Sequence, residues 1–133
     1  MSSGWARWRR ANPERARELA AQHTRAYKNR YPWATCLSSV RISARKRGIL
    51  CTIDSQWARD AWTGRCAVTG LEFAKSATPS PFSPSIDRIN PRSGYTRKNC
   101  RFVLLGYNML KHVGTDTDVL KIAEAICAKN KTT

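Results

Sequence analysis

The chain has 133 residues, a formal net charge of +15 at pH 7 and 41% hydrophobic residues. This length allows one domain, or a compact core with an N-terminal attachment, and the hydrophobic fraction argues against wholesale disorder. The sequence contains no apolar run long enough for a membrane span and begins without the apolar stretch of a signal peptide, so we expect an intracellular protein.

The positive charge is the strongest signal in the composition. An excess of this size attracts polyanions, because each Lys or Arg that contacts a phosphate releases a condensed counterion. Solubility alone needs far less charge. No single helix sets the charge against a strong apolar face, as a membrane-surface helix would. The composition therefore favours a nucleic acid as the partner.

The five cysteines are scattered and include no CxxC pair: Cys36, Cys51, Cys66, Cys100 and Cys127. This spacing does not indicate a four-cysteine zinc site. Most of them neighbour apolar residues, which predicts reduced, largely buried thiols. A structural zinc that uses Cys66 or Cys100 with other partners stays open.

The N-terminal residues 1–11 read as a flexible basic arm, or as an edge that docks through Trp5 and Trp8. A helix is predicted from Asn12-Pro13, since Asn is a good cap and Pro fits the first helical position. It ends at Tyr31-Pro32. His23 lies on its apolar stripe, where a packed histidine is favoured over a metal ligand.

A second helix is predicted over residues 34–47, closed by Gly48. Its Arg45, Lys46 and Arg47 form either a solvated face or a set of phosphate contacts, and the net charge favours the second. A short helix capped by Asp54 or Ser55 follows and ends at Gly64, with its tryptophans in the core. Residues 12–64 thus read as a helical DNA-binding lead-in.

From residue 65 onward the pattern becomes extended. Three prolines exclude a helix between residues 76 and 85. Strands are predicted at 85–89 and 100–105, separated by a turn-bearing loop around Gly94. A helix follows over 107–112, and Thr115 opens a capping box for the last helix. The fold class expected is α+β, with residues 65–133 as its core.

Asp87 and Asn108 are the first candidates for chemistry. Asp87 stands in an otherwise apolar strand, where an unpaired carboxylate is costly. If the start of the following helix packs on that strand, the Asn108 oxygen meets Asp87, and two such oxygens suit Mg²⁺ or Mn²⁺. Alternatively, Asp87 forms a structural ion pair with Arg88 or a nearby Lys, and Asn108 caps the helix. The spacing leaves both interpretations open.

Several separated motifs resemble, in order, the core of HNH (His-Me finger) endonucleases, above all small phage and prophage members with an Asp-Arg-Ile strand. They are SIDRINP at 85–91, GYT at 94–96, Asn99 and NMLK at 108–111, preceded by ARKRG at 44–48 and GRCAVTG at 64–70. The resemblance therefore covers Ala44 to Lys111. It implies a ββα-metal core and metal-dependent hydrolysis of DNA, in a bacterial cytoplasm or a phage-infected host cell.

The resemblance also implies roles for individual residues. Asp87 and Asn108 match the metal ligands, and Asn99 matches the asparagine that braces the loop and the catalytic residue. The residues expected to contact DNA, from charge position and resemblance together, are Arg45, Lys46, Arg47, Arg92, Lys98, Arg101 and Lys111. Duplex DNA is the expected partner, and the chain is expected to be a monomer or a homodimer.

The departure from the family lies at Arg88, where those enzymes carry a histidine as the general base. Arginine stays protonated, since its pKa exceeds about 12. Either His112 or His23 takes the proton, or the metal activates its own water, or the protein binds without cutting. In an active enzyme, Arg88 is also a candidate to clamp the scissile phosphate and stabilise the developing negative charge. His112 either reaches the site from the Asn108 face of the helix or stands at the helix C-terminus, where the dipole favours it.

The sequence thus predicts a Mg²⁺-dependent HNH endonuclease. The alternatives are a catalytically inactive DNA-binding protein of the same fold and an RNA-directed basic protein whose tryptophans stack on unpaired bases.

Overall fold

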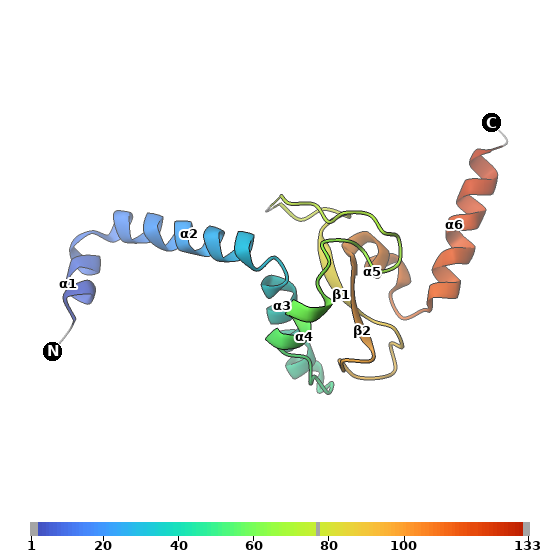
Figure 1. The fold of residues 1–133 in the computed structure, drawn as a ribbon, viewed down its shortest axis with the longest axis horizontal. Coiled ribbons are helices and arrows are strands. Elements are labelled where there is room, and N and C mark those ends of the chain that lie inside the picture. The colour runs from blue at the N-terminus through green and yellow to red at the C-terminus, as the bar shows by residue number, and fades with distance from the viewer. Residues whose placement is uncertain (1–2, 77, 132–133) are drawn as a thin grey trace. The chain divides into compact units, whose positions relative to one another are not determined.

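The computed structural model describes residues 3–76 and 78–131, and within them it contains six helices and one two-stranded antiparallel sheet (Figure 1). The elements are α1 (Gly4–Ala11), α2 (Pro13–Arg30), α3 (Ala34–Arg47), α4 (Ser55–Ala61), β1 (Pro84–Arg88), β2 (Cys100–Leu104), α5 (Leu105–Lys111) and α6 (Asp116–Asn130). The predicted α+β class is therefore confirmed. The chain divides into two compact units, residues 1–32 and 33–133, at the point where the first long helix was predicted to end.

The N-terminal unit is helical from its first described residues. Ser3 caps α1 by accepting a hydrogen bond from the Ala6 N–H at 3.2 Å, so residues 4–11 form a helix that the sequence did not predict. The basic arm and the docking edge stay predictions. Pro13 occupies the first turn of α2, as predicted, but the Asn12 side chain makes no cap hydrogen bond there, so that part of the prediction was wrong. In the described part of this unit only Ala16 is buried. His23 is exposed, so the prediction of a packed histidine was also wrong.

The second unit begins with α3, whose limits agree with the prediction. Gly48 ends it with φ +65°, a left-handed conformation that costs glycine little. The Asp54 carboxylate caps α4 by accepting from the Trp57 N–H at 2.9 Å. That helix ends at Ala61, three residues before the predicted stop at Gly64.

The sheet pairs β1 with β2 so that Asp87 lies opposite Arg101 and Ile86 opposite Phe102. Phe102 is the centre of an aromatic cluster in the core: the Trp57 ring stacks on it at 5.2 Å and the Trp62 ring meets it edge-on at 5.1 Å. Since successive strand residues point to opposite faces, Ile86 and Phe102 face this core while Asp87 and Arg101 point to the other side.

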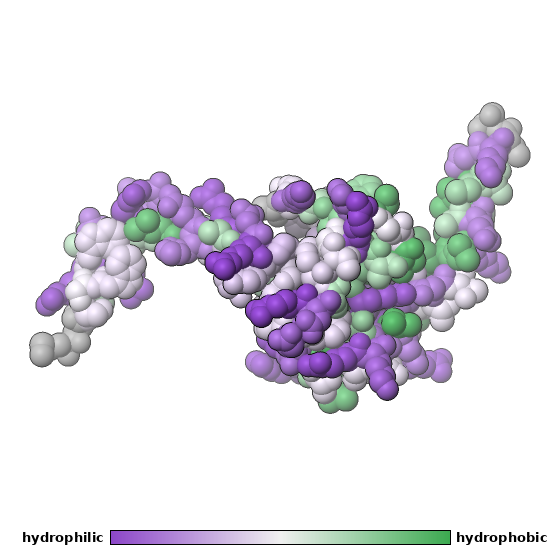
Figure 2. All heavy atoms as spheres, in the orientation of Figure 1, coloured by the Kyte–Doolittle hydropathy of each residue, from purple (hydrophilic) through white to green (hydrophobic). Residues whose placement is uncertain are grey.

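The chain passes from β2 into α5 without a loop. Gly106 lets Pro81 pack closely on the first turn of α5, because a Cβ there would lie 3.0 Å from the Pro81 Cβ and 3.1 Å from its carbonyl oxygen. The helix begins at Leu105, two residues earlier than predicted. The capping box at Thr115 is confirmed and opens α6, of which only Val119 is buried. Hydrophilic residues gather over α3 and α4, and apolar ones around α5 and α6 (Figure 2).

Among the helices of the described residues, none is both long and apolar enough to cross a membrane.

Candidate functional site

The helix α5 packs on β1, as the predicted approach of Asn108 to Asp87 requires. Asn108 makes this contact through its amide nitrogen, which donates to the Ser85 hydroxyl at 2.8 Å and to the Ile86 carbonyl oxygen at 3.2 Å. Asn108 is therefore placed one residue away from Asp87 along the strand. It does not cap the helix, because it lies in its fourth position.

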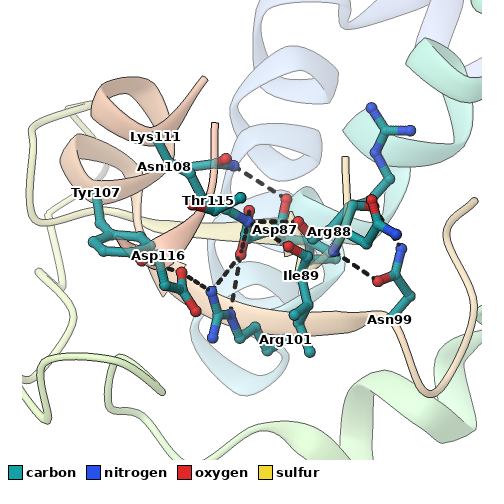
Figure 3. Close-up of polar contacts among 12 residues, drawn as sticks. Asp87, Arg88, Ile89, Asn99, Arg101, Tyr107, Asn108, Lys111, Thr115 and Asp116 are labelled. Atoms are coloured by element: carbon teal, nitrogen blue, oxygen red, sulfur yellow. Dashed lines mark hydrogen bonds and ion pairs between the residues drawn. The ribbon is translucent and has the colours of Figure 1, made fainter. Parts of the chain in front are cut away.

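Asp87 is buried, with 3% of its surface exposed, and its carboxylate holds a lysine (Figure 3). The Lys111 ammonium lies 2.9 Å from Oδ1 and 3.1 Å from Oδ2. It also donates to the carbonyl oxygens of Arg88 at 2.6 Å and Ile89 at 3.1 Å. The Lys111 side chain is only 1% exposed. The structure thus contains the ion pair with a nearby Lys that the sequence left open.

A second cation, Arg101, lies on the same carboxylate. Its Nε is 3.0 Å from Asp87 Oδ2, and its Nη2 is 2.6 Å from Asp116 Oδ1 at the start of α6. The Tyr107 hydroxyl donates to that same Asp116 oxygen. We call this chain of contacts, Lys111–Asp87–Arg101–Asp116–Tyr107, the Asp87 network. It joins α5, both strands and α6.

The Asp87 network changes the acidity of its outer members. The Arg101 hydrogen bond holds the pKa of Asp116 below its usual value, against the opposing effect of burial. Burial, together with the hydrogen bond to Asp116, raises the pKa of Tyr107 to about 12. The pKa of Arg101 is raised: burial opposes the charge, but the two carboxylates outweigh it. All these groups therefore keep their hydrogen-bonding forms at neutral pH.

This arrangement does not fit a divalent metal between Asp87 and Asn108. Both carboxylate oxygens already hold cations at about 3 Å. Two unit charges of the same sign at 4 Å repel by about 4 kcal/mol at an effective dielectric constant of about 20, and a divalent ion doubles this for each cation. Asn108 directs its amide nitrogen, not a ligand oxygen, at the strand.

Arg88 and Asn99 shape the loop between the strands. The Arg88 guanidinium donates to the Ser93 carbonyl oxygen at 3.0 Å and lies 4.9 Å from the centre of the Tyr95 ring. It is thus turned toward the loop. The Asn99 side chain accepts from the Asn90 N–H at 2.8 Å and donates to the carbonyl oxygens of Asn90 and Gly94. The loop-bracing role that the resemblance implied for Asn99 agrees with these contacts.

His112 lies at the C-cap of α5, where the chain leaves the helix with φ +47°. It is exposed, and its backbone N–H donates to the Asn108 carbonyl oxygen at 3.0 Å. Because the helix ends before it, His112 does not continue the side-chain face that carries Asn108. The position agrees with the helix-terminal alternative.

The residues expected to contact DNA fall into two groups. Arg45, Lys46, Arg47, Arg92 and Lys98 are exposed, and we call them the cationic surface. None of them takes part in an ion pair between described residues. Arg101 and Lys111 lie instead in the Asp87 network. Their predicted role as phosphate contacts is corrected, because both cations are turned inward onto carboxylates.

Two segments of the cationic surface are held together by backbone pairing. The Tyr95 N–H donates to the Leu50 carbonyl oxygen at 2.8 Å, and the Thr52 N–H donates to that of Tyr95 at 2.9 Å. The loop that follows α3 is therefore fixed beside the loop between the strands. Gly94 allows this approach, since a Cβ there would lie 2.7 Å from the Leu50 carbonyl oxygen.

Sequence reasoning missed Asp116 and Tyr107 as members of the site. One signal was available for Arg101: once the two strands are paired through the loop, it lies directly opposite Asp87 and carries the opposite charge. No such signal exists for Asp116, because its place depends on how α6 packs. Comparisons with models of protein families, with curated proteins and with solved structures gave no match to this chain.

Proposed function

We propose that this protein binds duplex DNA through the cationic surface, with the hairpin and α5 as its scaffold. One observation carries the proposal: the backbone pairing of Leu50 and Thr52 with Tyr95 fixes the segment that follows the basic end of α3 to the basic loop between the strands. Basic residues from separate segments that share a rigid support match the spaced phosphates of a duplex.

The charge balance of the second unit supports this proposal. Residues 33–133 contain 16 Lys and Arg against 7 Asp and Glu, a net charge of +9. Four of those acidic residues, Asp54, Glu72, Asp87 and Asp116, are already in ion pairs with basic partners of the same unit. The excess therefore resides on exposed side chains, where phosphate contact releases counterions.

The Asp87 network has a mechanical role in this proposal. Lys111 ties the end of α5 to the last residues of β1, and Arg101 ties β2 to α6. Asn99 then fixes the loop that begins just after β1 and carries Arg92. These contacts preorganise the loop, so that binding does not have to order it.

Metal-dependent DNA hydrolysis is the second candidate function. It is favoured by the order of hairpin and helix and by the position of Asn108 beside the residue that precedes Asp87. In this structure Asp87 offers no oxygen to a metal without the displacement of Lys111 or Arg101. For that reason we place DNA binding first and DNA cleavage second.

Salt-dependent binding tests the first candidate. A variant with Arg45, Lys46 and Arg47 each replaced by Gln should bind a labelled duplex more weakly, with the slope of log K against log salt reduced by about 3. The matched control replaces Lys121, Lys129 and Lys131 with Gln, which removes the same charge from α6 and its C-cap. If both variants lose affinity equally, only net charge matters, and the assignment of the cationic surface fails.

A cleavage assay tests the second candidate. The wild-type protein is incubated with supercoiled plasmid in Mg²⁺ or Mn²⁺, beside Asn108→Ala and Lys121→Gln, an exposed residue outside the cationic surface. We expect the plasmid to be bound and not cut. Nicking that is lost in Asn108→Ala and kept in Lys121→Gln would establish the endonuclease instead, provided that circular dichroism shows both variants folded.

A further inference from the structure

The N-terminal unit carries a pair of stacked tryptophans that the proposed DNA contacts do not use. Trp5 and Trp8 lie one helical turn apart on α1, with ring centroids 5.0 Å apart and planes inclined by 15°. Trp5 is 54% exposed. Stacked indoles usually lie in a core, yet only Ala16 is buried in the described part of this unit. The pair thus presents an aromatic face to solvent.

The structure holds this pair in place. Ser3 caps the first turn of α1, and the Asn12 side chain donates to the Trp8 carbonyl oxygen at 2.9 Å at its other end. These contacts hold both ends of the helix that carries the two indoles on one face, and the indoles stack on each other. A preformed aromatic face binds a planar ligand at a low cost in side-chain entropy.

The charge around the pair indicates the class of ligand. Residues 1–32 contain 8 Lys and Arg against 2 Glu, a net charge of +6. Arg7 and Arg9 alternate with the tryptophans along α1 and are exposed. A planar group next to an anion, as in a nucleotide, matches both features.

We propose that Trp5 and Trp8 form a stacking platform for unpaired bases of a single-stranded nucleic acid. The bases of a duplex have both faces covered by their neighbours, so only unpaired bases can stack on an indole. An anionic membrane is the competing partner. It is less well matched, because α1 has eight residues and its two large apolar side chains occupy one narrow stripe between arginines. This site is independent of the cationic surface proposed for duplex DNA.

The test compares full-length variants by fluorescence anisotropy with labelled oligothymidylate, oligouridylate and a duplex. Trp5→Ala/Trp8→Ala should weaken oligothymidylate binding by about tenfold or more, and duplex binding by less than about twofold. Trp5→Phe/Trp8→Phe should retain most of the affinity, since it keeps aromatic faces. Alanine is the better helix former, so loss of α1 does not explain the effect. The matched control is Phe82→Ala, which removes a similarly exposed ring (53%) from the second unit.

Each outcome of this test has a defined meaning. A parallel loss with oligouridylate extends the platform to RNA. A loss with one oligonucleotide alone shows that the platform distinguishes the two by the 2′-hydroxyl group or by the thymine methyl group. Unchanged oligonucleotide binding in the double alanine variant overturns the proposal, as does an equal loss with the duplex. Loss of binding to phosphatidylserine vesicles without loss of oligonucleotide binding assigns the pair to a membrane and also overturns it. The duplex-binding proposal is tested separately, because its Gln variants are measured on the duplex alone. Either proposal can therefore fail without the other.

Discussion

Replacing Lys111 with methionine removes the ammonium group that pairs with the Asp87 carboxylate and keeps most of the buried aliphatic part of the side chain. Four contacts are lost: two to the carboxylate and one each to the carbonyl oxygens of Arg88 and Ile89. Removing one partner of a buried ion pair costs about 3 to 5 kcal/mol. Because Arg101 remains on Asp87, we expect the lower end, about 3 kcal/mol. The exposed Lys98→Met is the control and should change stability by less than about 0.5 kcal/mol.

A double-mutant cycle separates this ion pair from its surroundings. Asp87→Leu alone should also cost about 3 kcal/mol, since it leaves the Lys111 ammonium buried with two carbonyl oxygens. The double variant Asp87→Leu/Lys111→Met leaves no unpaired charge at this pair, and Arg101 keeps Asp116. It should therefore cost about 3 kcal/mol rather than the sum of about 6, a coupling of about 3 kcal/mol.

Urea unfolding at pH 7, followed by tryptophan fluorescence and circular dichroism, measures these free energies. A cost below about 1 kcal/mol for Lys111→Met, together with additive single variants, would refute the reasoning. It would mean that Lys111 does not hold Asp87 in solution, and that the carboxylate is available to a metal after all. In that case Mg²⁺ should raise the unfolding midpoint of the wild-type protein above that in NaCl of equal ionic strength.

Three further predictions concern the surroundings of the site. Asn99→Ala should destabilise the protein by about 2 kcal/mol and speed amide hydrogen exchange between residues 90 and 95, because three loop hydrogen bonds are lost. Asp116→Asn should be destabilising at neutral pH. The pKa of Asp116 in the folded protein lies below its usual 3.8, so the stability that Asp116 contributes is fully present above pH 3.8. This stability is lost as the pH falls through the folded pKa. In pH-dependent unfolding, the wild-type and variant stability curves should therefore converge at low pH. With a thiol reagent at pH 8, Cys127→Ser should remove the fastest-reacting group, because Cys127 is exposed while burial raises the pKa of Cys36 to about 11 and of Cys100 to about 12. An unchanged fast phase in that variant would show that α6 does not expose its thiol as described.

Local signals in the sequence were sufficient for most helix limits. Caps and breakers such as Asn12-Pro13, Gly48 and Thr115 act within one turn, so the chain near them determines the outcome. α1 was missed because the cluster of Arg and Trp there suggested an arm, whereas Ser3 supplied an adequate cap. His23 was misjudged because apolar spacing alone does not say whether another element covers that face of the helix.

Among the site residues, too, some positions followed from the local order of elements and others depended on long-range packing. The approach of Asn108 to β1 followed from the order of strand, strand and helix, which leaves few ways to pack. The partners of Asp87 did not follow, since Lys111 lies 24 residues away and reaches the carboxylate only because α5 ends beside it. A buried carboxylate is stable only when it is paired with a positive charge. Long-range packing decides whether that charge belongs to a metal ion or to a side chain.

Arg88 and Lys111 both bear on whether the residues around Asp87 serve catalysis or structure. The resemblance places a base at residue 88, but the Arg88 guanidinium is directed at the Ser93 carbonyl oxygen and the Tyr95 ring, and it supports the loop. It also places a metal at Asp87, but Lys111 and Arg101 supply the positive charge that a buried carboxylate requires. Arg88, Lys111 and Arg101 thus each have a structural partner within the chain. The loop and the helix that they hold are the elements that support the surface for which we propose duplex binding.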